Sequence, residues 1–303
     1  MKWLWNFRRA RDEMWMGMAY MLISSVLLSL FSLFGKFAIE ETPFFLLTAL
    51  RFIIPLLIMI PYFLWTSSFK ELFLSSNFKL QLLRALCMLV YQYTIFYYLT
   101  FSSLLNATIL QNTFPLFLPI LEKLFFKHHF NKREIVSILI CFAGVLCILQ
   151  PDRGILEGLS LFVILAPLSQ AGSQMLYAHQ ARQENQKSTL FYLYFLCSIA
   201  TTAIYFFSPE HVNLGSSMVR FSLWTWITIM CLGVVSIFNQ YYRGKAYSFA
   251  KPSSLSPFLY FSLIVSGFLD WVIFHQFPNW LSAVGAFLVI AGGMIQLYER
   301  KTI

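Results

Sequence analysis

Four charged residues lie inside stretches that are otherwise almost wholly apolar, and they are the first candidates for chemistry. They are Lys36, Arg51, Glu122 and Asp270. A charge at the centre of a bilayer costs about 2.5–3.5 kcal/mol on insertion scales, so a charge retained there marks a transport pathway, a proton site or an ion pair. Lys36, Arg51 and Asp270 share the outer half of the predicted membrane, where they could form a gate or a static buried pair. Glu122 is the candidate for proton coupling, with an interfacial position as the alternative.

Uncharged polar side chains at helical spacing predict the lining of a polar cavity. Amides and hydroxyls in lipid need partners, so they face the interior of a helical bundle. Gln170, Gln174 and Tyr177 fall on one face of a single helix, at spacings of four and three. Hydrogen bonds between helices are the competing explanation for such residues. The residues predicted to line the cavity are Tyr93, Tyr97, Gln111, Gln170, Gln174, Tyr177, Asn239 and Tyr260.

Neither a catalytic motif nor a metal site is predicted. The sequence holds no HExxH, no GxSxG, no P-loop and no paired carboxylates in adjacent apolar segments. Its five cysteines lie in apolar stretches without a CxxC pair, which favours packing over zinc or disulfides. His128 and His129 have no third ligand nearby. No cofactor is therefore expected, and an intramembrane enzyme is the weakest of the competing functions.

The composition places these residues in a membrane protein. Of 303 residues, 58% are hydrophobic and only 12% are charged, and 33 are Phe. Soluble domains average roughly 45–50% apolar and about 25% charged residues. A soluble chain of this composition would expose apolar patches larger than monomers tolerate. The same figures exclude a disordered chain.

Ten segments have the length and apolarity that a membrane-spanning helix needs, about 20 residues each. They do not alternate in polarity as barrel strands would, so the predicted fold class is an all-α integral membrane protein. The predicted spans are 14–38, 43–65, 82–101, 104–126, 135–150, 157–180, 188–207, 221–242, 252–274 and 280–298.

Basic residues gather on one side of this predicted topology. With the N-terminus in the cytoplasm, 18 of the 22 Lys and Arg, Arg84 and Arg243 among them, fall at cytoplasmic ends and loops, and two fall in outer loops. The positive-inside rule then predicts that both termini are cytoplasmic. The net charge of +9 reflects this topology, and no nucleic-acid partner is expected.

The chain divides into two halves at QPDRGILEG, near residues 150–158, with five spans on each side. An odd number of spans means that a repeat of the first half would be inserted upside down, a device of secondary transporters. FAGVLCI at 142–148 and IAGGMIQ at 290–296 are similar, although close helix packing explains such small residues equally well. The predicted division is a cytoplasmic segment at 1–13, five-helix repeats at 14–151 and 157–298, and a cytoplasmic tail at 299–303.

Several motifs resemble the EamA family of the drug/metabolite transporter superfamily. The segment YSFAKPSSLSPFLYFSLIVSGFLDWVIFHQFPNW and the LSAVGAFLVIAGG that follows are similar to the closing part of that family. The first half agrees at Lys36, Arg51, Pro115 and Gly144. The matching residues of the second half are Ser256, Pro257, Phe258, Tyr260, Gly285, Ala286, Ile290, Gly292 and Gly293.

One departure from the family pattern concerns two loops. The family usually carries a Gly-Glu pair at the end of the fourth helix and again after the ninth. Here the matching pairs are Lys127-His128 and His275-Gln276. If those glutamates take part in gating, this chain must brace its gates differently.

The resemblance implies a 5+5 inverted repeat around a central cavity that works by alternating access in the bacterial inner membrane. The implied function is secondary active transport of a small polar or amphipathic metabolite, such as an amino acid or derivative. Relatives with a similarly Phe-rich makeup import S-adenosylmethionine. A multidrug or toxic-compound exporter of the same fold is the alternative, and a channel is a third. The expected partners are the substrate, membrane lipid and either a proton or an exchanged metabolite, with the protein as a monomer or a dimer.

Overall fold

The computed structural model describes residues 2–65, 77–99, 110–126, 132–149, 161–208, 221–275 and 280–298, and every regular element within these ranges is an α-helix. The prediction of an all-helical chain is confirmed for this part. The helices are α1 Lys2–Ile39, α2 Phe44–Trp65, α4 Phe78–Leu99, α6 Phe114–Phe126, α7 Lys132–Leu149, α8 Leu161–Gln183, α9 Gln186–Phe207, α11 Leu223–Phe249, α12 Pro252–Leu259, α13 Phe261–Phe274 and α14 Trp280–Tyr298.

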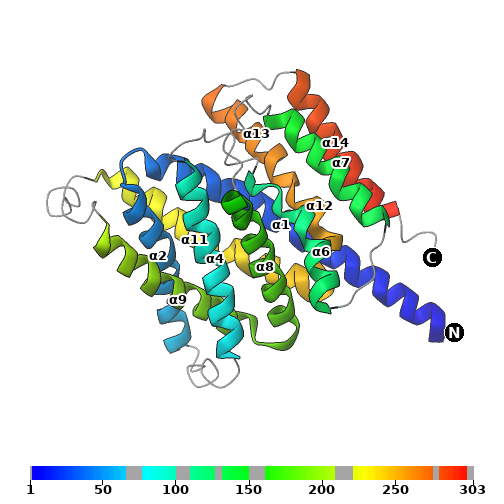
Figure 1. Cartoon of the computed structure of the whole chain (residues 1–303), viewed down its shortest axis with the longest axis horizontal. Coiled ribbons are helices and arrows are strands. Elements are labelled where there is room, and N and C mark those ends of the chain that lie inside the picture. Colours follow the sequence, from blue (N-terminus) through cyan, green and yellow to red (C-terminus); the bar gives the residue numbers. More distant parts are fainter. Residues whose placement is uncertain are drawn as a thin grey trace.

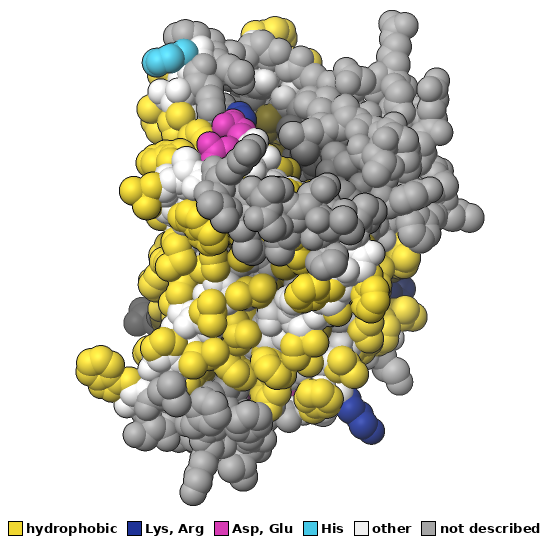
Figure 2. Space-filling model, turned by 90° about the vertical axis from the view of Figure 1, so that its left-hand side faces the viewer, with side chains coloured by type: hydrophobic (Ala, Val, Ile, Leu, Met, Phe, Trp, Pro, Cys, Tyr) yellow, Lys and Arg dark blue, Asp and Glu magenta, His cyan; other side chains and the backbone are white. Residues whose placement is uncertain are grey.

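The molecule is apolar on its surface and partly polar inside. Within the described residues, five helical stretches are long and apolar enough to cross a membrane, and two shorter ones are strongly apolar. Figure 2 shows hydrophobic side chains spread over most of the described surface in that view, with few charges among them. The interior meanwhile holds Arg84, Glu122, Glu134 and Arg243. This distribution suits a protein whose solvent is lipid.

Two of the predicted spans are interrupted rather than continuous. The predicted span 104–126 has a turn at Asn112 and Thr113, after which α6 begins; residues 101–109 lie outside the described ranges. The predicted span 252–274 is divided at Tyr260 into α12 and α13. Pro257 explains why α12 lacks one helical hydrogen bond near this break, because proline has no N–H to donate to the carbonyl of Ser253. The Oγ of Ser256 donates to that carbonyl instead, at 2.8 Å.

The helices pack in pairs that join the N-terminal half, α1 to α7, to the C-terminal half, α8 to α14. In this pairing α1 lies along α11, α4 along α8, α2 along α9 and α7 along α14. Figure 1 shows α7 and α14 side by side at one flank of the molecule. Among the described helices, each half therefore packs mainly against the other half.

The pair of α7 and α14 is in backbone contact through glycines. A Cβ atom on Gly144 would lie 2.6 Å from the carbonyl oxygen of Gly285, and one on Gly285 would lie 2.5 Å from that of Gly144. Farther along, Ser137 Oγ donates to the carbonyl oxygen of Gly292 at 2.6 Å. Small residues permit this approach, which is how helices gain contact in lipid. We call this contact the glycine seam.

Each half also supplies a carboxylate to the beginning of a helix in the other. Glu41, in the turn between α1 and α2, accepts hydrogen bonds from Ser222 N at 3.3 Å, from Ser222 Oγ at 3.0 Å and from Thr225 Oγ1 at the start of α11. Glu184, between α8 and α9, accepts from Asn77 N at 3.2 Å and from Gln81 Nε2 at 2.7 Å at the start of α4. Unsatisfied N–H groups and the helix dipole favour a carboxylate at such ends. The hydrogen bonds from Thr225 and Ser222 hold the pKa of Glu41 below its ordinary value.

Candidate substrate site

The two helix breaks touch each other. Tyr260, at the break between α12 and α13, is 1% exposed, and its hydroxyl donates to the carbonyl oxygen of Asn112 at 3.0 Å. Asn112 lies at the turn before α6. Broken helices at corresponding positions of two repeats point to a binding site, because their freed backbone groups can hold polar ligands. The predicted cavity residue Tyr260 therefore stands at the junction of the halves.

A second polar cluster joins α4, α8 and α11. Tyr177 is fully buried, and its hydroxyl donates to the carbonyl oxygen of Gln240 at 2.6 Å. The guanidinium carbon of Arg84 lies 3.6 Å from the centroid of the Tyr177 ring, within cation–π range. The ring of Tyr247 meets that of Tyr177 edge-on, and its hydroxyl donates to Gln174 Oε1 at 3.1 Å. The structure thus brings together the predicted pair Gln174 and Tyr177 and adds Arg84, Gln240 and Tyr247.

Two buried arginines were not among the residues predicted to line the cavity. Arg84 and Arg243, assigned to cytoplasmic ends, are 2% and 5% exposed inside the bundle. Each lies six residues from a helix end, about 9 Å at 1.5 Å per residue. Counting Lys and Arg at the ends of the predicted spans assigns each residue to a side of the membrane, but it does not tell a buried arginine from one at the membrane surface. In the predicted spans, Arg84 lies two residues inside 82–101 and Arg243 lies one residue beyond 221–242, so nothing in the sequence indicated their depth.

The two arginines differ in their surroundings. Arg243 donates from Nε to Ser24 Oγ and from Nη2 to Asn239 Oδ1, both at 3.3 Å, and Ser24 Oγ donates to Asn239 Oδ1 at 2.7 Å. The predicted cavity residue Asn239 is thus engaged with α1. In Arg84, by contrast, Nε and Nη1 are buried and have no hydrogen-bond partner among the described residues.

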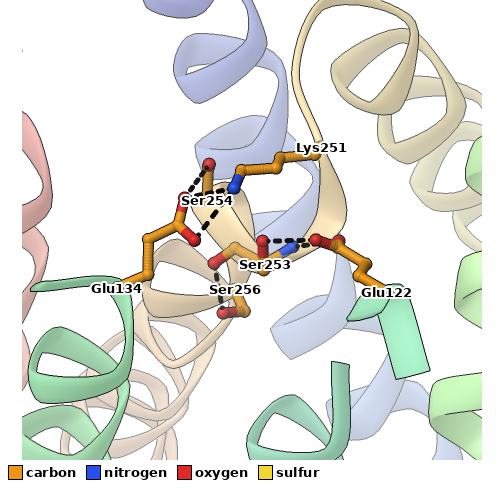
Figure 3. A network of polar contacts seen from close by, with 6 residues as sticks. All are labelled: Glu122, Glu134, Lys251, Ser253, Ser254 and Ser256. Carbon is orange, nitrogen blue, oxygen red and sulfur yellow. Dashed lines mark hydrogen bonds and ion pairs between the residues drawn. The ribbon is translucent and has the colours of Figure 1, made fainter. Parts of the chain in front are cut away.

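Glu122 and Glu134 hold the beginning of α12 from the N-terminal half (Figure 3). Glu122, 4% exposed on α6, accepts from Ser253 N at 2.8 Å and from Ser253 Oγ at 2.7 Å. Glu134 on α7 accepts from Ser254 Oγ at 2.8 Å, and its Oε1 lies 2.8 Å from Lys251 Nζ. Glu122 is thus buried against α12. We call these five residues the α12 clamp.

The residues predicted to form an outer gate lie in different settings. Arg51 donates from Nη1 to Gln92 Oε1 at 3.0 Å, and its guanidinium carbon lies 5.1 Å and 5.3 Å from the rings of Phe31 and Phe52. Lys36 is exposed in the last turn of α1. The side chain of Asp270 lies outside the described set, so an ion pair with it stays a prediction.

The remaining predicted cavity residues are less enclosed. Tyr93 and Gln111 are half-buried, and the Tyr93 ring stacks on that of Phe45 with centroids 6.4 Å apart. Gln170 is half-buried, and its Oε1 has no hydrogen-bond partner within the described part of the chain. The side chain of Tyr97 is outside the described set. Among the described residues, no group of three His, Cys, Asp or Glu could hold a metal ion.

The comparison with protein families decides the identity of the fold. The model of the EamA-like transporter family matches the chain twice, at residues 15–150 and 159–298. The chain belongs to the EamA-like transporter family. This EamA transporter is accordingly a multi-pass protein of the bacterial cell membrane, and its family is one of transporters rather than enzymes.

Relatives of this EamA transporter carry different small molecules. It is 22% identical over 288 residues to the S-adenosylmethionine uptake transporter of Rickettsia prowazekii, covering 94% of this chain and 93% of that one. It is 24% identical over 198 residues to the riboflavin transporter of Brucella anthropi, covering 65% and 69%. A solved crystal structure of a protein aligns with a TM-score of 0.77 at 15% identity, covering 94% of this chain and 98% of that one, which shows the shared fold.

One departure of this EamA transporter from the family pattern has a backbone consequence. His275 has a φ of 54°, in the left-handed region that favours glycine. The resemblance places a family glycine at this position. His275 therefore keeps a glycine-like backbone conformation without being glycine. The other departing pair, Lys127-His128, lies outside the described ranges.

Proposed function

We propose that the protein is a secondary active transporter that moves a small polar or amphipathic metabolite across the membrane by alternating access. The observation that carries the proposal is the polar junction of the two halves, where the helix breaks meet at Tyr260 and Asn112. A metabolite needs polar partners halfway across the bilayer, and a junction between two halves can open to either side. No P-loop occurs in the sequence, so the driving force is a proton gradient or exchange of metabolites.

Reciprocal contacts support a 5+5 inverted repeat, with repeats at 14–151 and 157–298. The first helix of each half, α1 or α8, lies along the third helix of the other, α11 or α4. The first turn of each half supplies the capping carboxylate, Glu41 or Glu184, to that same third helix. The two separate family matches agree with this division.

The charge distribution supports cytoplasmic termini. Removing Arg84 and Arg243 from the 18 basic residues assigned to the cytoplasmic side leaves 16, against two in outer loops. The bias therefore survives the correction. In this orientation the α12 clamp lies on the cytoplasmic side, and Arg51 lies toward the outside.

Spacing supports paired acidic residues on opposite sides of the membrane. Glu122 follows Asn112 by ten residues, and Asp270 follows Tyr260 by the same ten. Glu122 is thus our candidate for an inner gate and proton coupling, and Asp270, with Lys36 and Arg51 as candidate partners, for an outer gate. The predicted cavity residues stay part of this proposal.

The substrate class we favour is an amino acid or a derivative, with S-adenosylmethionine as the first compound to test. The relative that carries this name aligns over nearly the whole of both chains. The purified protein should be stabilised thermally by its substrate, since a ligand at about 100 times its Kd adds roughly 2.7 kcal/mol.

Counterflow in proteoliposomes tests the transport mechanism. Vesicles loaded with unlabelled S-adenosylmethionine and diluted into labelled compound should accumulate label transiently. Flux without stimulation by internal substrate would indicate a channel. No flux of this compound, nor of a panel of amino acids, would contradict the proposed substrate class.

A further inference from the structure

Arg84 carries donors for which the described structure offers no acceptor. We propose that Arg84 anchors a carboxylate group of the transported substrate. This inference rests on the proposed function and adds to it a residue and a chemical group. It starts from the buried Nε and Nη1 atoms of Arg84, which have no hydrogen-bond partner among the described residues.

Leaving two guanidinium nitrogens without acceptors inside a membrane bundle is costly. A buried ion loses its hydration, and this loss is compensated only where charges and hydrogen bonds replace the water. The Tyr177 ring, 3.6 Å from the guanidinium carbon, compensates for part of the loss by its cation–π contact. The remaining cost would be relieved by an anion that binds during the transport cycle.

Three other cations of the bundle, one buried and two partly buried, have acceptors within the protein. Arg243 has both Ser24 and Asn239 as acceptors, Lys251 has Glu134, and Arg51 has Gln92. Each of these charges is held by the protein itself. Arg84 differs from them because two of its buried donors have no acceptor among the described residues, which favours an acceptor that comes from a bound ligand.

A second buried group without a partner belongs to Gln240, a residue that contacts Tyr177 through its backbone. The hydroxyl of Tyr177 donates to the backbone of Gln240, whose Oε1 is buried and has no hydrogen-bond partner in the described part of the chain. Two residues that contact Tyr177 thus carry unpartnered groups among the described residues: donors on Arg84 and an acceptor on Gln240. An amino-acid head group presents a carboxylate and an ammonium on one carbon, which suits this arrangement. Arginine is the side chain best suited to carboxylates.

A static partner inside the protein is the competing explanation. Gln180, three residues after Tyr177 on α8, is fully buried, and neither atom of its side-chain amide has a partner among the described residues. A rotation of this amide toward Arg84 would make the arginine purely structural. Replacing Gln180 by Met, similar in size but unable to accept a strong hydrogen bond, separates the two explanations.

The experiment compares ligands that differ by the carboxylate alone. The full-length protein is screened by thermal stabilisation with S-adenosylmethionine and its decarboxylated form, L-methionine and 3-(methylthio)propylamine, and L-arginine and agmatine. We expect the acid of at least one pair to bind about 10- to 100-fold more tightly than its amine, the range of a charge-assisted hydrogen bond. Arg84→Gln should abolish this ratio while amine binding persists, and Gln180→Met should preserve it.

Arg84→Lys serves as a second variant in case Arg84→Gln fails to fold. It keeps the charge but loses the planar fork, so a reduced preference for the acid is expected. An unchanged ratio in either Arg84 variant overturns the inference, as does a wild-type protein that binds the amines equally well. Counterflow of the amines alone would uphold transport and overturn the role of Arg84. If no compound of the panel binds or is transported, both this inference and the proposed substrate class fail.

Discussion

Single side chains tie the two halves together through carboxylates that accept from helix beginnings. Glu122 and Glu41 both accept a backbone N–H and a hydroxyl, on α12 and at the start of α11 respectively. In both cases the acceptor and the donors come from different halves. Such contacts fix which helix of one half meets which loop of the other.

Glu122→Gln should destabilise the protein by about 1–3 kcal/mol. The amide keeps one acceptor for Ser253 but turns an N–H group toward the other donor. Thermal unfolding of the purified protein in detergent measures the change. In a double-mutant cycle, Ser253→Ala should cost much less when combined with Glu122→Gln than alone. Additive costs would show that the two residues do not act together.

The cap at Glu41 predicts an acid sensitivity. Its pKa is lowered in the folded protein by hydrogen bonds from Thr225 and Ser222. A lowered folded-state pKa adds stability that is complete well above the unfolded value and is lost as pH falls through the folded one. Stability should therefore decline below about pH 4.5, the ordinary carboxylate value.

Unfolding temperatures of wild type and Glu41→Gln between pH 7 and pH 3 check this expectation. The variant should be less stable at pH 7, and the difference should shrink as the pH falls. A difference that is constant over the range would show that the carboxylate is not held in its charged form by Thr225 and Ser222.

Among the helices, the glycine seam is a backbone-to-backbone contact that depends on the absence of side chains. Gly144→Ala should destabilise the protein by about 1–3 kcal/mol, since its Cβ would meet the backbone of Gly285 at 2.6 Å. Gly267→Ala on α13 is the matched control, because a Cβ there meets nothing within 4 Å. That variant should be neutral or gain up to about 1 kcal/mol. Melting curves in detergent compare the two; equal effects would contradict the close approach.

The sequence predicted helices better than it predicted their interruptions. Hydropathy averages over a whole span, so Tyr260 and the turn at Asn112 left no trace in it, and the nearby prolines, Pro257 and Pro115, were the visible warnings. Burial of Arg84 and capping by Glu122 depend on which helices meet, which periodicity along one segment cannot tell. Gln174 and Tyr177 were found because their spacing already places them on one face of α8.

For the molecule as a whole, the direction of every helix follows from one assignment. If both termini are cytoplasmic, a fluorescent protein fused after Ile303 should fluoresce, because it folds in the cytoplasm. Alkaline phosphatase inserted at 150–158 should be active, because that segment would lie outside. The reverse pattern would overturn the orientation and would move the α12 clamp to the outer face.

Folding order is constrained by the glycine seam. Ser137 and Gly292, which bond across it, are 155 residues apart, a stretch that takes on the order of ten seconds to synthesise. During that time the surface of α7 around Gly144 would lack its partner α14. Insertion of α14 then completes the seam, so a chain interrupted before its last helix leaves the backbone around Gly144 without its packing partner.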